Sequence, residues 1–457
     1  MLYNEFVGGK MRKKLGILAL TAVLGTGAYA ASIDHIQTYT PEYLGNQAQN
    51  GMINNVSVYY NPAGLMQLER GTYFHAGMQI AFGTEEMKYK GKKYEADLFQ
   101  PIPNFSLYSV RDERAIFWTF GAIGGGGDLE YKDGVAGIAV VPDIINGSPI
   151  LSGMGLTNAR DIGSSAEGTN MYVQNTLGRA WMINDKLSMS IAARAVLGMR
   201  NLKGDLNIST DSLLPAFQKL HADIDSERTA WGFGGQIGFN YKASDRLNLA
   251  MRYDTRVKMN FKASGKETPV LNLGLGFSDF YPEYAPGVKY RRDLPAILAA
   301  GASYKVTDRW TMALSGNYYF NKDAKMDKTK KSNNVLLVAV NAKHFDPEYD
   351  NGWEIAVGTE YKLTDKWTWI GSVNYADTGA KKNSYDDIEY ALNSIMVGTG
   401  LKYKPNDTME WVATVTHFFY DGKTGNYEEK YPGNAKIVEQ KYDKSISAVG
   451  LGFTKKF

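Results

Sequence analysis

Apolar and polar positions alternate with a period of two residues along most of this chain. In the segment 72–83 the even positions from Phe74 to Phe82 are apolar, and the odd positions include His75, Gly77 and Gln79. The segment 229–242 repeats this pattern, with aromatic and aliphatic residues opposite Gly, Gln and Asn. A face that is apolar from end to end, with small and polar residues opposite, is typical of a strand that faces lipid in a β-barrel.

Short turns and long polar stretches alternate between these segments. Six short turns carry an acidic residue, most often beside a basic one, and lie at 111–114, 184–186, 244–246, 307–309, 364–366 and 405–407. Seven long polar stretches lie at roughly 84–102, 125–170, 203–228, 264–293, 321–351, 376–393 and 421–444. These connections join fourteen strands and place both chain termini on the side of the short turns. We therefore predict an all-β membrane protein, a 14-stranded antiparallel outer-membrane β-barrel.

The predicted strands are 72–83, 103–110, 115–124, 171–183, 187–202, 229–242, 247–263, 294–305, 310–320, 352–363, 367–376, 394–403, 409–420 and 445–457. A soluble β-sandwich is the competing interpretation. It does not account for two unequal families of connections or for a repeat of roughly 60 residues between the acidic turns.

The start of the chain predicts export. Basic residues after Met11 precede an apolar run, 15–23, and small residues ending at Ala30. We interpret 1–30 as a secretory signal peptide with Met11 as the true start; the apolar run is short for the alternative, a membrane helix. Residues 31–71 do not alternate and are rich in Asn and Gln, so we expect them to form a hatch inside a barrel made by 72–457, because fourteen strands enclose an open lumen.

Composition excludes several function classes. With 22% charged residues the chain is too polar for an α-helical membrane protein, and a net charge of +3 gives no nucleic-acid footprint. The chain has no cysteine, and its five histidines show no metal-ligand spacing, so we expect no metal and no cofactor. No serine lies in a nucleophile-elbow pattern, which disfavours an enzyme such as a barrel-embedded hydrolase.

The motif just before the first strand resembles that of a known family. The stretch 58–65, Val-Tyr-Tyr-Asn-Pro-Ala-Gly-Leu, is similar to the Asn-Pro-Ala signature of the FadL/TodX (OmpP1-like) outer-membrane transporters of long-chain fatty acids and aromatic hydrocarbons. The upstream stretch 45–51 is similar to the small-residue spacing of that family's hatch. The resemblance assigns Asn61, Pro62, Ala63 and Gly64 to the hatch and its gating; the alternative is a plain turn that enters the first strand.

The resemblance also implies a route for the ligand. Hydrophobic ligand is expected to pass from the outer loops to a lumenal pocket and to leave sideways at a kinked third strand. Gly124, Gly125, Gly126 and Gly127 are the candidates for this kink, because a glycine run weakens a strand and permits bulges. A flexible entry to the following loop is the alternative.

Two outer loops carry apolar residues that are unusual for exposed loops. Leu213, Phe217 and Leu220 are spaced, with Ile224, as one stripe of a short helix. Leu273, Phe277 and Phe280 lie in the next long loop. We expect these six residues to form an outer hydrophobic groove that first collects ligand; the alternative is that the two loops pack on each other and shield the barrel mouth.

Arg194 and Arg200 are the candidates for binding a ligand head group. If the apolar residues of 187–202 face lipid, both arginines point into the lumen, where a fatty-acid carboxylate forms charge-assisted hydrogen bonds. Pairing with acidic neighbours in a structural role is the alternative.

The most specific function that these patterns favour is outer-membrane transport of hydrophobic compounds, with long-chain fatty acids ahead of aromatic hydrocarbons. The expected partners are a hydrophobic small molecule, outer-membrane lipid and lipopolysaccharide, with no nucleic acid, and we expect a monomer. A general diffusion porin for small solutes is the alternative, but the plug-like segment 31–71 disfavours an open lumen.

Overall fold

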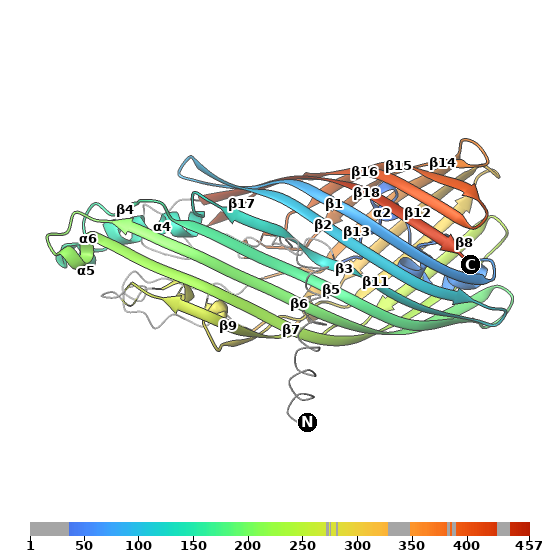
Figure 1. Cartoon of the computed structure of the whole chain (residues 1–457), viewed down its shortest axis with the longest axis horizontal. Helices are drawn as coiled ribbons and strands as arrows, with labels where there is room; N and C mark the ends of the chain where they lie inside the picture. The colour runs from blue at the N-terminus through green and yellow to red at the C-terminus, as the bar shows by residue number, and fades with distance from the viewer. Residues whose placement is uncertain are drawn as a thin grey trace, which may run out of the picture.

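A computed structural model arranges the alternating segments as one closed antiparallel sheet, in which the first strand pairs with the last (Figure 1). The structure describes residues 36–270, 274, 276–279, 282–327, 348–381, 384–385, 390–426 and 439–457. Fourteen strands cross the barrel, which confirms the predicted count. They are β1 (Gly71–Tyr89), β2 (Lys92–Val110), β3 (Arg114–Tyr131), β5 (Ser165–Met182), β6 (Leu187–Ser209), β7 (Lys219–Lys242), β8 continued by β9 (Leu247–Asp254, Asn260–Thr268), β10 continued by β11 (Lys289–Arg291, Ile297–Lys305), β12 (Trp310–Tyr319), β13 (Gly352–Lys362), β14 (Trp367–Asp377), β15 (Ser394–Asn406), β16 (Met409–Tyr420) and β18 (Glu439–Lys456).

The end of the barrel with the long connections is called the outer end here, and the end with the tight turns the inner end. The long connections contain β4 (Arg160–Asp161), β17 (Lys423–Asn426), α4 (Ala136–Gly147), α5 (Pro149–Gly153), α6 (Pro215–Gln218), η2 (Phe277–Asp279), η3 (Pro282–Tyr284) and η4 (Asn321–Asp323). Within the described residues, no helix is long and apolar enough to cross a membrane.

The outward face of the barrel is apolar, as the alternation predicts. Phe82 and Phe233 are exposed, whereas His75 and Gln79 on the opposite face of β1 are fully buried. Exposed aromatic residues gather at both ends of the strands, as in the aromatic girdles of outer-membrane barrels. They include Tyr241, Tyr304, Trp310, Tyr361, Trp367 and Trp411 near the tight turns, and Tyr253, Tyr318, Trp353, Tyr375 and Phe419 toward the outer end.

Four of the tight turns share one hydrogen-bonding scheme. In the turn that begins at Ser244, Oγ accepts hydrogen bonds from the backbone N–H groups of Arg246 (3.2 Å) and Leu247 (3.0 Å). A side-chain oxygen that binds two N–H groups in this way stabilises a short turn. Asn184, Thr307 and Thr364 accept the corresponding pair of bonds in their own turns.

The prediction of a long loop over 84–102 is wrong. β1 and β2 continue through this stretch and are joined by the turn Lys90-Gly91, in which both residues have positive φ (50° and 80°). The alternation also continues, with Met87 and Tyr94 buried and charged residues on the outward face. Outward positions beyond the lipid need not be apolar, so a charged strand resembled a loop.

Other boundaries also differ from the predictions at the outer end. β3, β6, β7 and β18 extend further outward than expected, and the predicted strand 247–263 is interrupted between β8 and β9. The helix expected to include Leu213 and Ile224 is limited to α6, and Leu220 and Ile224 are buried on β7. Both have even numbers, so their spacing suits one face of a strand as well as a helical stripe.

Residues 36–70 fold inside the barrel and are mostly buried, as a plug should be. This segment, called the hatch below, contains α2 (Pro41–Gly45), α3 (Ser57–Tyr60) and η1 (Pro62–Gln67). The predicted signal peptide lies outside the described residues.

Candidate functional site

Polar side chains of the barrel wall hold the hatch by hydrogen bonds to its backbone. The Gly51 carbonyl accepts from Asn248 Nδ2 (3.0 Å) and Ser303 Oγ (2.8 Å). Such bonds are needed because buried peptide groups must be satisfied and the hatch has little regular structure. Further bonds of this kind run from Gln47 N to Ser372 Oγ, from Asn50 N to Ser315 Oγ, from Arg252 Nη1 to the Tyr59 and Tyr60 carbonyls, from Thr414 Oγ1 to the Pro41 carbonyl and from Ser188 Oγ to the Ala63 carbonyl.

Glycines on the inner wall let the hatch approach the strands closely. A Cβ atom on Gly398 would lie 1.9 Å from the Leu44 carbonyl oxygen. One on Gly301 would lie 2.5 Å from the backbone nitrogen of Gly51. Glycine in a strand often marks such a close approach of another segment. The hatch is therefore seated on a wall that has no side chains at these contacts.

The Asn-Pro-Ala-Gly motif, 61–64, lies at a contact between the hatch and β7. Asn61 Nδ2 donates to Asn240 Oδ1 on β7 (2.7 Å), and Asn61 Oδ1 accepts from the backbone N–H of Gly64 (3.2 Å) as the N-cap of η1. Pro62 is the first residue of η1, where its missing N–H is not needed. The motif thus shapes and docks this part of the hatch, and its gating role remains a prediction.

β3 is irregular at Gly124–Gly127, the glycines that the sequence analysis proposed as a kink. Its register with β5 shifts between Ala122 and Gly124 and again between Gly125 and Asp128, so the shifts bracket the glycine run 124–127. Gly125 has φ 83°, and a Cβ atom there would lie 2.0 Å from the Asn170 carbonyl oxygen. Only glycine adopts this conformation without strain.

β2 and β3 do not pair beside the glycine run or outward of it. In the described chain their ladder ends at Asn104 and Gly121, after which β2 pairs with β1 and β3 pairs with β5. The two unpaired edges, 92–103 and 122–131, form what we call the β2–β3 seam. The sequence analysis missed the β2 edge, although Pro101 and Pro103 signal it: proline cannot donate to a ladder and is confined to strand edges and bulges.

A lumenal apolar cluster reaches from the seam to a cavity in the outer half of the barrel. It contains Ile123 of β3 together with Ile36, Tyr172, Val196, Ala230, Val257, Met259, Phe261, Leu294, Ile297 and Tyr319. The outer cavity has a volume of about 470 Å³ and shares Ile36, Leu294 and Tyr319 with this cluster. This volume lies within the range of small-molecule sites.

Two lysines that line the outer cavity pair with one carboxylate. Lys322 Nζ lies 2.8 Å from Asp350 Oδ1, and Lys381 Nζ lies 3.6 Å from the same oxygen. The hydrogen bond from Lys322 holds the pKa of Asp350 below its usual range, and the pKa of Lys322 is raised by the same bond. Both groups therefore stay charged near neutral pH. The other lining residues are Ile36, Arg292, Asp293, Leu294, Pro295, Tyr319, Asn321, Ala324, Met326, Glu348, Tyr349 and Thr378.

Arg194 and Arg200 both point into the lumen, in different surroundings. Arg194 Nε donates to Gln174 Oε1 (2.9 Å), and its Nη1 donates to the Thr255 carbonyl (3.3 Å). Arg200 pairs across β6 and β7 with Arg228, a residue that the sequence analysis assigned to a loop and so passed over. The guanidinium groups of Arg200 and Arg228 both lie over the rings of Phe261 and Tyr284. That of Arg228 also lies over the ring of Tyr290.

The residues of the predicted outer groove are found in different environments. Leu213 is 95% exposed, whereas Leu220 and Phe277 are buried in one hydrophobic cluster against which Phe217 packs. A Cβ atom on Gly204 of β6 would lie 2.3 Å from the Phe277 ring, so Phe277 covers the inner wall. Leu273 and Phe280 lie outside the described residues. The groove remains a prediction.

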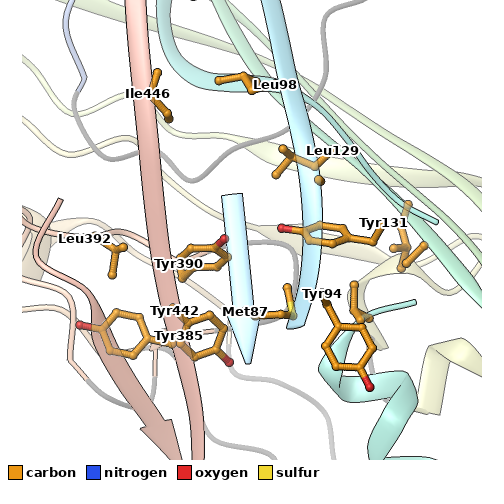
Figure 2. Close-up of a cluster of buried hydrophobic side chains, with 14 of the residues drawn as sticks. Met87, Tyr94, Leu98, Leu129, Tyr131, Tyr385, Tyr390, Leu392, Tyr442 and Ile446 are labelled. Atoms are coloured by element: carbon orange, nitrogen blue, oxygen red, sulfur yellow. The ribbon is translucent and has the colours of Figure 1, made fainter. Parts of the chain in front are cut away.

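The outer half of the lumen beside β1, β2, β3 and β18 is filled by tyrosine-rich packing (Figure 2). Lys444 is buried here, with Nζ 3.4 Å from Glu85 Oε1 and 4.8 Å from the centre of the Tyr390 ring. The labelled members are Met87, Tyr94, Leu98, Leu129, Tyr131, Tyr385, Tyr390, Leu392, Tyr442 and Ile446. Leu129 and Tyr131 of this packing follow Gly124–Gly127 on the outward part of β3, whereas the outer cavity lies along β10 to β14.

A second cavity, of about 450 Å³, lies at the inner end beneath the hatch. Residues 53–55 of the hatch line it, and most of its other walls are charged or polar. Lys402 Nζ lies 2.7 Å from Glu360 Oε1 within it. A polar cavity is a poor environment for an apolar ligand. Across the described ranges, no group of three or more His, Cys, Asp or Glu side chains is arranged to hold a metal ion.

Comparison with known proteins shows which family and which relatives this barrel resembles. The family model described as "Outer membrane protein transport protein (OMPP1/FadL/TodX)" matches residues 42–457. The chain is 25% identical over 276 residues to a long-chain fatty acid transport protein of Salmonella typhi, covering 54% of this chain and 62% of that one. It is 25% identical over 186 residues to a 47 kDa outer membrane protein of Pasteurella multocida, covering 39% and 41%. The matched stretches thus span less than two thirds of these relatives.

Solved structures with the same fold cover nearly the whole barrel. A FadL homologue of Pseudomonas aeruginosa has a TM-score of 0.63 and 14% identity, covering 93% of this chain and 100% of that chain. The toluene transporter TodX of P. putida has a TM-score of 0.63 and 15% identity, covering 92% and 99%. At these identities the likeness establishes the fold.

A fourteen-stranded barrel that holds a buried hatch defines the class of hatch-closed outer-membrane barrels. The match over residues 42–457 goes further: the chain belongs to the OMPP1/FadL/TodX family of outer membrane transport proteins. Its location is therefore the outer membrane of a Gram-negative bacterium. Family membership confirms the resemblance noted in the sequence, and the members of this family are transport proteins and not enzymes.

Proposed function

We propose that this protein carries long-chain fatty acids across the outer membrane. The observation that carries the proposal is the lumenal apolar cluster, which reaches from the outer cavity to Ile123 at the β2–β3 seam. A ligand that follows this cluster stays in contact with apolar side chains. Each methylene that it would otherwise expose to water costs about 0.8 kcal/mol.

The proposed route has four steps. Apolar residues of the outer connections, including Leu213, collect the ligand, and the outer cavity then holds it. The hatch rearranges, and the ligand leaves sideways into lipid through the seam beside Gly124–Gly127. Direct passage to the inner end is unfavourable, because the hatch lies in the way and the cavity below it is charged.

Basic side chains support an acid as the ligand. Lys322, Lys381 and Arg292 line the outer cavity, and Arg200 and Arg228 lie over Phe261 of the apolar cluster. A carboxylate gains charge-assisted hydrogen bonds from such groups, and a hydrocarbon does not. Arg194 remains a candidate, although its guanidinium already binds Gln174 and Thr255.

Aromatic hydrocarbons are the second candidate. The rings of Tyr172, Phe261 and Tyr319 in the apolar cluster suit an aromatic ligand, and TodX, which shares the fold, is a toluene transporter. A general diffusion porin is disfavoured because the hatch occupies the lumen. Contact with lipid and lipopolysaccharide, and the monomeric state, remain predictions.

Binding to the intact protein in lipid nanodiscs tests the substrate class. Replacing Arg200 and Lys322 together by Gln should weaken oleate binding by about tenfold or more, because hydrogen bonds to a charged group contribute about 1.5–3 kcal/mol. Toluene binding should not change. Lys362→Gln, at the inner end, is the matched control. Equal loss of oleate and toluene affinity, or no loss of either, would contradict the assignment of an acid.

A further inference from the structure

A buried carboxylate on β13 lies between the outer cavity and the hatch. Glu354 is 5% exposed, and its Oε1 accepts hydrogen bonds from Tyr319 Oη (2.8 Å) and Asn317 Nδ2. Its Oε2 accepts from Asn374 Nδ2 (3.1 Å). In the described part of the chain Glu354 forms no ion pair with a basic residue. Neutral donors from β12 and β14 therefore stabilise this charge, and each donor matters.

The donors of Glu354 also belong to the two neighbouring sites. Tyr319 lines the outer cavity. Asn317 Oδ1 accepts a hydrogen bond from Asn50 Nδ2 of the hatch (2.9 Å), and Asn374 Nδ2 lies 3.5 Å from Tyr43 Oη of the hatch. One connected set of hydrogen bonds thus runs from the cavity wall, through Glu354, to two points of the hatch.

Asn50 is a major attachment of the hatch to the wall. Besides its bond to Asn317, its Nδ2 lies 3.2 Å from the carbonyl oxygens of Ala300 and Gly316, and its backbone N–H donates to Ser315 Oγ (2.9 Å). These partners lie on β11 and β12. A shift of the Asn317 amide therefore acts directly on one of the hydrogen bonds that attach the hatch to the wall.

We propose that Glu354 is a positioning residue that couples ligand in the outer cavity to release of the hatch. The proposal rests on the transport function proposed above. A ligand in the cavity contacts the Tyr319 ring and turns its hydroxyl away from Glu354. The carboxylate, left with its two amide donors, then shifts toward Asn374 and draws the Asn317 amide with it, which weakens the bond from Asn50. The hatch is loosened at this point only when ligand is present.

A single thiol in the hatch can measure this coupling. The chain has no cysteine, so Ala48→Cys introduces the only one. Ala48 is fully buried and packs beside Ala313 and Ala356 of the wall. Its reaction with a water-soluble maleimide therefore reports the fraction of time for which the hatch is displaced.

The experiment compares labelling rates in lipid nanodiscs with and without oleate, with oleate binding measured separately. In the Ala48→Cys protein we expect oleate to accelerate labelling by about tenfold, a usual size for coupling between sites. At an oleate concentration that saturates its binding, Tyr319→Phe should show no acceleration, because without the hydroxyl it labels rapidly even in the absence of oleate. Glu354→Gln, which has no carboxylate to act on Asn317, should label slowly both with and without oleate. Tyr318→Phe, the same change on the adjacent outward-facing residue, should behave as the parent.

Two results would overturn the proposal, and they are distinguishable. If Tyr319→Phe binds oleate and keeps the acceleration, the coupling does not pass through Glu354, and the direct contact of the cavity with Ile36 of the hatch is the better explanation. If the parent protein does not bind oleate at all, the substrate class proposed above fails, and the coupling inference fails with it.

Discussion

Replacing Asn61 by Ala should shift the hatch toward its displaced state. Asn61 forms two kinds of hydrogen bond. The bond from the Gly64 N–H to Asn61 Oδ1 lies within the hatch and persists if the hatch moves as a unit. The bond from Asn61 Nδ2 to Asn240 Oδ1 (2.7 Å) joins the hatch to β7. Only this second bond favours the docked state over the displaced one.

The size of the shift follows from that single bond. A buried neutral hydrogen bond contributes about 0.5–1.5 kcal/mol. Since 1.4 kcal/mol corresponds to a factor of ten, the displaced population should rise by about 2- to 12-fold. Loss of the cap costs about 1 kcal/mol more in hatch stability, but it affects both states.

Ion conductance in planar lipid bilayers measures the displaced fraction. Asn240→Ala removes the acceptor and leaves the cap intact, although it also removes bonds between Asn240 and Asn248. The double variant completes a cycle that isolates the Asn61–Asn240 term. We expect each single change to raise the open fraction and the double variant to add little beyond either. Fully additive effects would refute the reasoning, because they would mean that this bond contributes nothing to docking.

Two further predictions concern the glycine wall and the seam. Gly398→Ala places a methyl group 1.9 Å from the Leu44 carbonyl oxygen, so it should displace the hatch and raise the conductance. Gly235→Ala, where no atom lies nearer than 3.8 Å to the added methyl group, should leave the conductance unchanged. Equal conductance of the two variants would contradict the close-approach argument. Replacing Pro101 and Pro103 together by Val restores two N–H donors at the β2 edge and should favour pairing of β2 with β3 across the seam. Oleate uptake by cells should then slow while oleate binding is unchanged, and unchanged uptake would count against lateral exit.

The transmembrane part of the fold could be predicted from the sequence because lipid imposes one rule on every strand. Outward residues between the aromatic girdles must be apolar, and the alternation therefore identified fourteen strands and the inward orientation of Arg194 and Arg200. Beyond the lipid that rule no longer holds. Most outward residues of 84–102 are charged, so the outer parts of β1 and β2 were interpreted as a loop.

The lumenal sites could be predicted only in part, because they join residues that are distant in the sequence. The Asn-Pro-Ala motif located the hatch, since its residues are contiguous. The outer cavity instead combines Ile36, Leu294, Tyr319 and Lys381, which come together only once strand registers are known. Glu354 gave no signal at all, because one inward Glu in an alternating strand resembles any other polar residue.

Uptake of labelled oleate by a Gram-negative host without its own transporter tests the central claim most directly. Cells that express the intact chain should take up oleate faster than cells with an empty vector, without admitting small labelled sugars. Sugar entry without faster oleate uptake would contradict the account and favour a diffusion porin.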